Sequence, residues 1–155
     1  MKGLPRLLAH YNAIDGQLDD DLNNPQNSVR RQSVIEDRQK ANDHAYFVLC
    51  WGQLEVAIDV ACRNAIRKRI QNPDWSKRRA WDLYNPEEKR LSGLSFEERA
   101  TLVLDKGAGL RSEWQLVMKY YTLRNQIAHG GSHEVRIDLN GVAKDFYRIQ
   151  SKLAP

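Results

Sequence analysis

The stretch Tyr46–Cys62, "YFVLCWGQLEVAIDVAC", decides the fold of this chain. Apolar residues recur along it at helical spacing, and Leu49, Val56 and Val60 also cover the side opposite to the main stripe. A helix that is apolar on two sides is buried on two faces. We therefore expect this helix to form the centre of a helical bundle. The main stripe consists of Phe47, Cys50, Trp51, Leu54, Ile58, Ala61 and Ala65.

Helical patterns continue on both sides of this stretch. We expect a first helix from Leu4 to about Asp15 and a second from Ser28, as its N-cap, to about Ile70. One short helix is expected within the connection 71–88.

The C-terminal half carries two further start signals. Capping-box spacing occurs at Ser95 and Glu98 and again at Ser112 and Gln115, and each pair predicts a helix start. The last helix is predicted from a single apolar stripe. Residues 1–155 are thus interpreted as a single all-α domain, an up-and-down helical bundle of four to five main helices. The stripe of the last helix is Val142, Phe146, Ile149 and Leu153.

Composition indicates a soluble globular protein. Hydrophobic residues make up 41% and charged residues 28% of the 155 residues. No run of roughly 18 apolar residues occurs, and the N-terminal apolar stretch is too short for a signal peptide. We therefore expect no membrane span and a cytoplasmic location. Cys50 and Cys62, roughly 18 Å apart along one helix, are expected to be buried thiols. No Cys/His cluster has metal-ligand spacing, so neither a metal nor another cofactor is expected.

Basic residues gather between residues 63 and 90, although the net charge of the chain is only +4. The aromatic residues Trp75, Trp81 and Tyr84 are interleaved with them. This pattern suits a polyanion, most simply RNA. A solvated helix face whose aromatic residues point inward explains it equally well. The basic residues are Arg63, Arg67, Lys68, Arg69, Lys77, Arg78, Arg79, Lys89 and Arg90.

A second stretch, "LRNQIAHGG" at Leu123–Gly131, brings three polar residues together at a helix end. The helix that begins after Ser112 is expected to run to His129, with Gly130 at the C′ position. Leu116, Tyr120, Leu123 and Ile127 form its bundle face, and Gln115, Lys119, Thr122 and Gln126 form its solvent strip.

The remaining arc of this helix mixes apolar and polar residues. Trp114, Val117 and Tyr121 share it with Arg124 and His129. We expect this arc to be a second buried surface, against another copy of the chain. The alternative is that its apolar residues pack beneath a loop such as 71–90. Arg124 is long enough to swing towards the imidazole, so both groups can converge on one phosphate.

The segment "RNQIAH", Arg124–His129, resembles the R-x4–6-H motif of the HEPN (higher eukaryote and prokaryote nucleotide-binding) superfamily, which commonly has Asn, Asp or His after the Arg. The resemblance implies a metal-independent endoribonuclease, often a toxin or defence effector, that works as a homodimer with paired motifs at the interface. An antitoxin or another protein is a further partner of this class. A related toxin set has Tyr two residues beyond the His, where this chain has Gly131. Some members are inactive and bind RNA, a nucleotide or a protein, which is the alternative function.

The residue types suit RNA cleavage by attack of the 2′-OH. Imidazole titrates near neutral pH, so His129 is the expected general acid–base. The Arg124 guanidinium grips phosphate oxygens and stabilises transition-state charge. Asn125, Tyr121 and Glu55 are expected to support the site or to bind substrate. A carboxylate at Glu55 could hold Arg124 in place, and the alternative for Glu55 is an intrahelical ladder with Asp59 and Arg63.

The other histidines have weaker functional interpretations. His44 is interpreted as structural and His10 as an ordinary helix residue. His133 follows the glycines and could enter the cleft, although a solvated loop position is the simpler interpretation.

Overall fold

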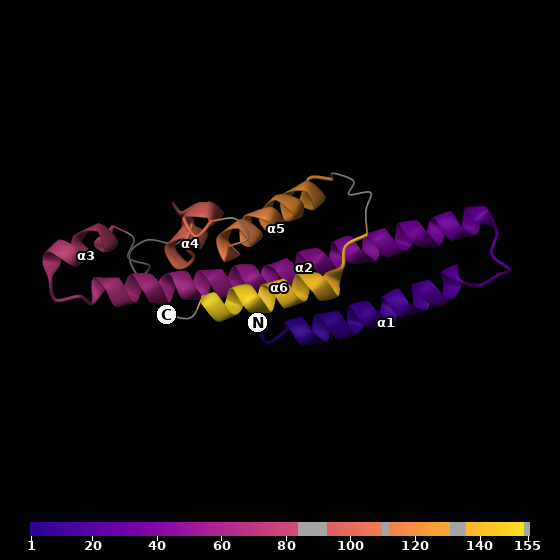
Figure 1. Ribbon diagram of the computed structural model, residues 1–155, viewed down its shortest axis with the longest axis horizontal. Coiled ribbons are helices and arrows are strands. Elements are labelled where there is room, and N and C mark those ends of the chain that lie inside the picture. The colour runs from indigo at the N-terminus through magenta and orange to yellow at the C-terminus, as the bar shows by residue number, and fades with distance from the viewer. Residues whose placement is uncertain (84–92, 110–111, 131–135, 154–155) are drawn as a thin grey trace. The chain divides into compact units, whose positions relative to one another are not determined.

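The computed structural model describes residues 1–83, 93–109, 112–130 and 136–153. These residues contain six helices and no strand, which confirms the all-α helical fold (Figure 1). The helices are α1 (Leu4–Leu22), α2 (Val29–Ile70), α3 (Trp75–Asp82), α4 (Phe96–Val103), α5 (Glu113–Ala128) and α6 (Leu139–Lys152).

The chain groups into two compact units. Unit 1 consists of Met1–Gln53 and Tyr120–Phe146, and unit 2 consists of Leu54–Lys119 and Tyr147–Pro155. The helices α2, α5 and α6 contribute residues to both units. The motif of interest lies in unit 1, whereas the basic stretch lies in unit 2.

The first helix is longer than its sequence predicts. It continues to Leu22 instead of ending near Asp15, and its second half lies beside the N-terminal half of α2 (Figure 1). Acidic residues of this helix make tertiary contacts. Asp15 pairs with Arg136, and Asp19 accepts a hydrogen bond from Gln39. Polar residues on the exposed side of a helix do not end it.

Helix α2 is continuous, and its predicted boundaries are confirmed. The backbone N–H of Arg31 donates to Oγ of Ser28 at 3.4 Å, as expected for an N-cap. The main stripe is buried from Phe47 through Ile58. The predicted second buried face is wrong, because Leu49, Val56 and Val60 are 52%, 61% and 52% exposed. The rings of Tyr120 and Phe146 pack on Phe47 and Trp51, which belong to the main stripe.

Helix α2 also has the length and composition of a membrane-crossing helix. One 18-residue window has a mean hydropathy of 1.4, and 33% of that window is buried inside the protein. Core helices of soluble proteins have the same composition, so this feature alone does not assign a location.

An aromatic cluster forms the core of unit 1. The ring of Tyr120 lies 6.1 Å from that of Phe47 and 5.3 Å from that of Phe146, which meets it edge-on. Trp51 packs against Phe146 at 6.2 Å. Aromatic pairs of this kind add about 0.5–1.5 kcal/mol each beyond the area they bury. Tyr120 thus holds the start of the motif-bearing half of α5 against α2, and Phe146 holds α6 against α2.

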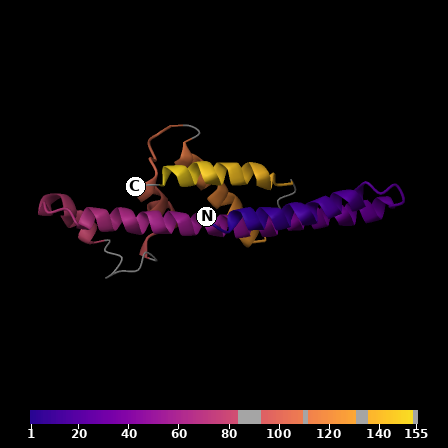
Figure 2. The same cartoon turned by 90° about the horizontal axis from the view of Figure 1, so that it is seen from below.

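Unit 2 is built around Cys62 and Ile66, which are fully buried on α2. Trp81 of α3 and Leu102 of α4 are among the residues that pack on them. Figure 2 shows α3 at the C-terminal end of α2. Helix α4 begins with the predicted capping box, in which Ser95 Oγ accepts from the Glu98 N–H and a Glu98 carboxylate oxygen accepts from the Ser95 N–H.

Candidate functional site

The last two turns of α5 carry the motif Arg124–His129, and the local sequence fixes where this helix begins and ends. Oγ of Ser112 accepts from the Gln115 N–H at 3.3 Å at the start. At the other end, His129 still donates its backbone N–H to Asn125 O at 3.0 Å. Gly130 then adopts φ +75°, a left-handed conformation that glycine takes without strain. The predicted helix end at Gly130 is therefore confirmed.

Arg124 is partly buried and points its guanidinium at its neighbour. Nη1 donates to Oδ1 of Asn125 at 3.0 Å. Its Nε atom is buried and has no hydrogen-bond partner among the described residues. A guanidinium has five N–H donors, so one contact leaves donors for an incoming anion. The buried N–H also costs free energy until an acceptor reaches it.

His129 is exposed on the turn that ends α5. Within the described ranges, no side-chain hydrogen bond joins it to Arg124 or to Asn125. The expected swing of Arg124 towards the imidazole is not seen, because Asn125 is the adjacent acceptor and takes the guanidinium first. The imidazole is thus open to solvent, while the guanidinium is held along the helix.

Tyr121 has a packing role. Its ring lies 6.1 Å from that of Trp51 on α2, tilted by 31°, and the residue is half-buried. This contact helps to hold the motif-bearing turns of α5 against α2 within unit 1. The ring stabilises the position from which Arg124 and Asn125 project.

Glu55 has a different partner from the one expected. Its carboxylate pairs with Nη2 of Arg99 at 3.5 Å, and Asp59 pairs with Nη1 of the same guanidinium. Arg99 comes from α4, so these acids join α2 to α4 inside unit 2, whereas Arg124 belongs to unit 1. The structure therefore gives Glu55 a tertiary ion pair in place of the intrahelical ladder considered from the sequence.

The N-terminal part of the mixed arc of α5 is buried within the chain, whereas Tyr121 and Arg124 are half-buried and His129 is exposed. Val117 is fully buried, and Trp114 is 9% exposed and donates from Nε1 to Thr101 Oγ1 at 3.1 Å. The expectation that this arc needs another copy of the chain to cover it is wrong for these two residues, since the chain itself covers them. The predicted solvent strip of α5 is confirmed as exposed at all four positions.

Sequence reasoning missed a buried polar cluster around Asp43 in unit 1. This carboxylate is fully buried, and it accepts from Tyr11 Oη at 2.8 Å, Arg136 Nε at 2.7 Å and the Ile137 N–H at 2.8 Å. Burial, with the added effect of donating to Asp43, raises the pKa of the Tyr11 phenol well above its ordinary value. Four donor groups from three residues surround the carboxylate, because Arg136 Nη2 also donates to it at 3.3 Å, so the cluster is structural. Only a tertiary contact across 93 residues reveals it.

The remaining histidines fit the structural interpretations. His10 is exposed on α1, and His44 is half-buried on α2. His133 lies outside the described residues. Cys50 and Cys62 are buried free thiols, as expected. Across the described ranges, no group of three or more His, Cys, Asp or Glu residues is placed to hold a metal ion.

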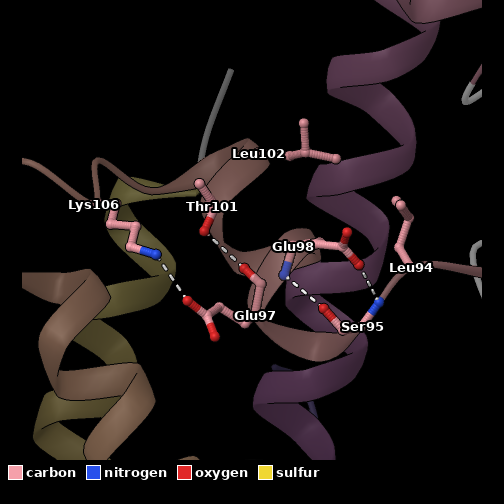
Figure 3. Close-up of a pocket in the computed structure, with 7 residues that line it drawn as sticks. All are labelled: Leu94, Ser95, Glu97, Glu98, Thr101, Leu102 and Lys106. Carbon is pink, nitrogen blue, oxygen red and sulfur yellow. Dashed lines mark hydrogen bonds and ion pairs between the residues drawn. The ribbon is translucent and has the colours of Figure 1, made fainter.

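A separate hollow of about 490 Å³ lies on unit 2 over α4 (Figure 3). Its polar groups are already engaged with one another. Lys106 Nζ donates to Glu97 at 2.8 Å, and Ser95 and Glu98 form the capping box described above. Thr101 Oγ1 donates to the Glu97 carbonyl at 2.8 Å. The capping-box hydrogen bonds in its lining stabilise the start of α4. None of the described side chains in the hollow is a candidate catalytic group.

Comparison with protein-family models, with curated proteins and with solved structures finds no match to this chain.

Proposed function

We propose that this protein is a metal-independent endoribonuclease of the HEPN type, with Arg124 and His129 as its catalytic residues. One observation supports it most. The Arg124 guanidinium is held beside Asn125, its buried Nε has no partner among the described residues, and less than two turns later the helix ends on an exposed histidine. A phosphate oxygen is the acceptor that best satisfies such a guanidinium, through short charge-assisted hydrogen bonds.

The proposed reaction uses the nucleophile that RNA carries. A base removes the 2′-OH proton, the 2′-oxygen attacks phosphorus, and the P–O5′ bond breaks as an acid protonates the 5′-oxygen. The products are a 2′,3′-cyclic phosphate and a 5′-hydroxyl. His129 serves as general acid or base, and Arg124 stabilises the charge that develops on the phosphate oxygens. Asn125 is a positioning residue, because it accepts from the guanidinium of Arg124.

A homodimer with the site at its interface is part of this proposal. One imidazole per chain serves one of the two proton transfers, so a second copy of His129 would supply the other. Dilution of the wild-type chain with the His129→Ala chain tests this requirement. Activity should fall with the square of the wild-type fraction if each site needs two histidines. A linear fall, or a monomer by light scattering, would contradict the dimer.

Cleavage of RNA by the purified protein in EDTA tests the enzyme itself. Arg124→Ala should lower the rate by about 10²–10³-fold, and His129→Ala by about 10²–10⁴-fold. His10→Ala is the matched control, since it removes an equally exposed histidine from α1. Because His129 is exposed, its removal should leave the melting temperature unchanged. Analysis of the product ends should find cyclic phosphates.

The alternative is an inactive module of the same fold that binds RNA, a nucleotide or a protein. The observation in its favour is that no described hydrogen bond links His129 to Arg124. Absence of cleavage across tRNA, mRNA and rRNA, by folded protein that still binds RNA, would establish this alternative. A toxin or defence effector acting in the cytoplasm should arrest growth when expressed, and the His129→Ala form should not.

A further inference from the structure

The C-terminal turns of α2 and the short helix α3 form a surface that the proposed active site does not use. Residues 63–79 contain seven basic side chains and one acidic side chain, a formal charge of +6, whereas the whole chain carries +4. All of these residues belong to unit 2. We refer to Lys68, Arg69, Asn72, Trp75 and Arg79 as the α2–α3 surface.

The local sequence holds α3 rigidly at this place. Asn72 Oδ1 accepts from the Asp74 N–H, and Asp74 in turn caps α3 by accepting from the Ser76 N–H at 2.9 Å. Hydrogen bonds from Ser76 lower the pKa of Asp74, so the cap stays ionised. Arg78 donates to the Asn72 and Pro73 carbonyls at 3.3 Å. The turn before α3 is therefore fixed by its own side chains.

The two tryptophans of α3 have different environments. Trp81 packs on the Cys62–Ile66 core, with the guanidinium of Arg69 5.4 Å from its ring. Trp75 is 59% exposed, and the guanidinium of Arg79 lies 5.4 Å from its ring. Trp81 thus anchors the helix, while Trp75 presents an aromatic platform beside a cation. A hollow of about 400 Å³, lined by Ala65, Lys68, Arg69 and Asn72, adjoins the turn before α3.

We propose that the α2–α3 surface binds single-stranded RNA, with a base stacked on Trp75 and phosphates held by Lys68, Arg69 and Arg79. An exposed aromatic ring next to cations is the combination that binds unpaired nucleotides. The bases of a duplex are already stacked on one another and cannot reach such a ring. The proposal rests on the proposed function only in taking RNA as the polyanion, because binding here needs neither Arg124 nor His129.

An anionic membrane is the other polyanion that attracts Trp and basic residues. Insertion needs an apolar helix face, and Trp75 is the one large exposed apolar side chain within α3, since Trp81 is turned to the core. The ring of Trp75 is also paired with a guanidinium, which suits stacking better than burial in lipid. These contacts favour the nucleic acid.

The test is a binding titration of the full chain with a labelled 2′-O-methyl oligoadenylate, which lacks the 2′-OH and cannot be cleaved. An abasic oligomer of the same length is the second probe. Trp75→Ala should weaken oligoadenylate binding by about tenfold and leave the abasic oligomer unchanged, and Trp75→Phe should restore most of the affinity. Tyr147→Ala, at an exposed ring on α6, is the matched control. Lys68→Ala should reduce the slope of log K against log salt by about 0.7, and Lys144→Ala should not.

Three results would overturn the proposal. Oligoadenylate affinity that is unchanged in Trp75→Ala would do so, as would equal affinity for the abasic oligomer. Binding to phosphatidylserine vesicles without binding to the oligonucleotide would assign the surface to membranes. Failure of RNA binding at the α2–α3 surface can be distinguished from failure of the proposed ribonuclease function. Trp75-dependent binding without any cleavage leaves this proposal standing, whereas cleavage together with oligoadenylate affinity that is unchanged in Trp75→Ala leaves only the ribonuclease.

Discussion

Nη1 of Arg124 donates to Oδ1 of Asn125 at 3.0 Å, so two consecutive residues of α5 form one polar unit at the protein surface. The hydrogen bond holds one end of the guanidinium beside the Asn125 amide. The buried Nε has no acceptor among the residues that the structure describes. The first prediction tests what this bond does.

Asn125→Ala should lower RNA cleavage by about tenfold, which is less than the loss from removing Arg124, because the guanidinium remains but loses its orientation. Asn125→Asp keeps an acceptor at the same place and should recover most of the rate. The measurement is the single-turnover cleavage rate of each variant. Asn125→Ala with full activity would show that the bond does not position Arg124.

The Asp43 cluster should dominate the stability of unit 1. Asp43→Asn leaves the guanidinium of Arg136 without its buried anion, and breaking such a pair costs about 3–5 kcal/mol. Since the Arg136 side chain is 37% exposed, we expect the lower end of that range. Urea unfolding measures the change. Asp37→Asn, which removes a surface pair with Lys40, is the control and should cost less than about 0.5 kcal/mol. Equal effects of the two substitutions would contradict the structural role of Asp43.

Two glycines should respond to alanine with opposite signs. Gly130 has φ +75° and an added Cβ would meet nothing within 4 Å, so Gly130→Ala should cost about 1–2 kcal/mol through backbone strain alone. Gly16 lies inside α1, also in open space, and Gly16→Ala should stabilise by about 0.5–1 kcal/mol. Thermal unfolding of both variants gives the two signs. A stabilising Gly130→Ala would mean that α5 does not end in a left-handed residue.

The thiols should make stability fall at alkaline pH. Burial raises the pKa of Cys50 and Cys62 to about 11 from the ordinary 9.0. A thiol whose pKa is raised by folding contributes stability that is fully present below about pH 9. This contribution to the free energy of unfolding is lost as the pH rises towards 11. Thiol labelling by Ellman's reagent at about pH 8 should be more than about 100-fold slower in the native protein than in denaturant. Rapid labelling of the native protein would show that these thiols are accessible.

Local signals account for the parts of the fold that the sequence predicts. The cap at Ser28, the capping box at Ser95 and the left-handed Gly130 depend on neighbours within a few residues, and each is confirmed. Burial of the stripe from Phe47 to Ile58 follows from helical periodicity in the same way.

Tertiary partners explain what the sequence could not give. The pairing of Arg99 with Glu55 and Asp59 joins residues about 40 positions apart, and periodicity carries no information about it. The hydrophobic periodicity around Val56 is the same whether or not another helix covers this residue, so its exposure could not be predicted from the sequence. For the candidate site, the residue types of the motif can be read from the sequence. The packing of Tyr121 on Trp51 is a tertiary contact and could not be predicted.

The bond from Arg136 to Asp43 also has a consequence for synthesis on the ribosome. The two residues are 93 positions apart, so Asp43 is synthesised long before its partner. While the chain emerges from the ribosome, the Asp43 carboxylate of α2 has no Arg136 guanidinium to neutralise it. Such a charge stays hydrated until its partner arrives, because an unpaired ion is costly to bury. Unit 1, with its candidate site, therefore closes only after Arg136 has been synthesised, and a chain terminated before that residue leaves it unfinished.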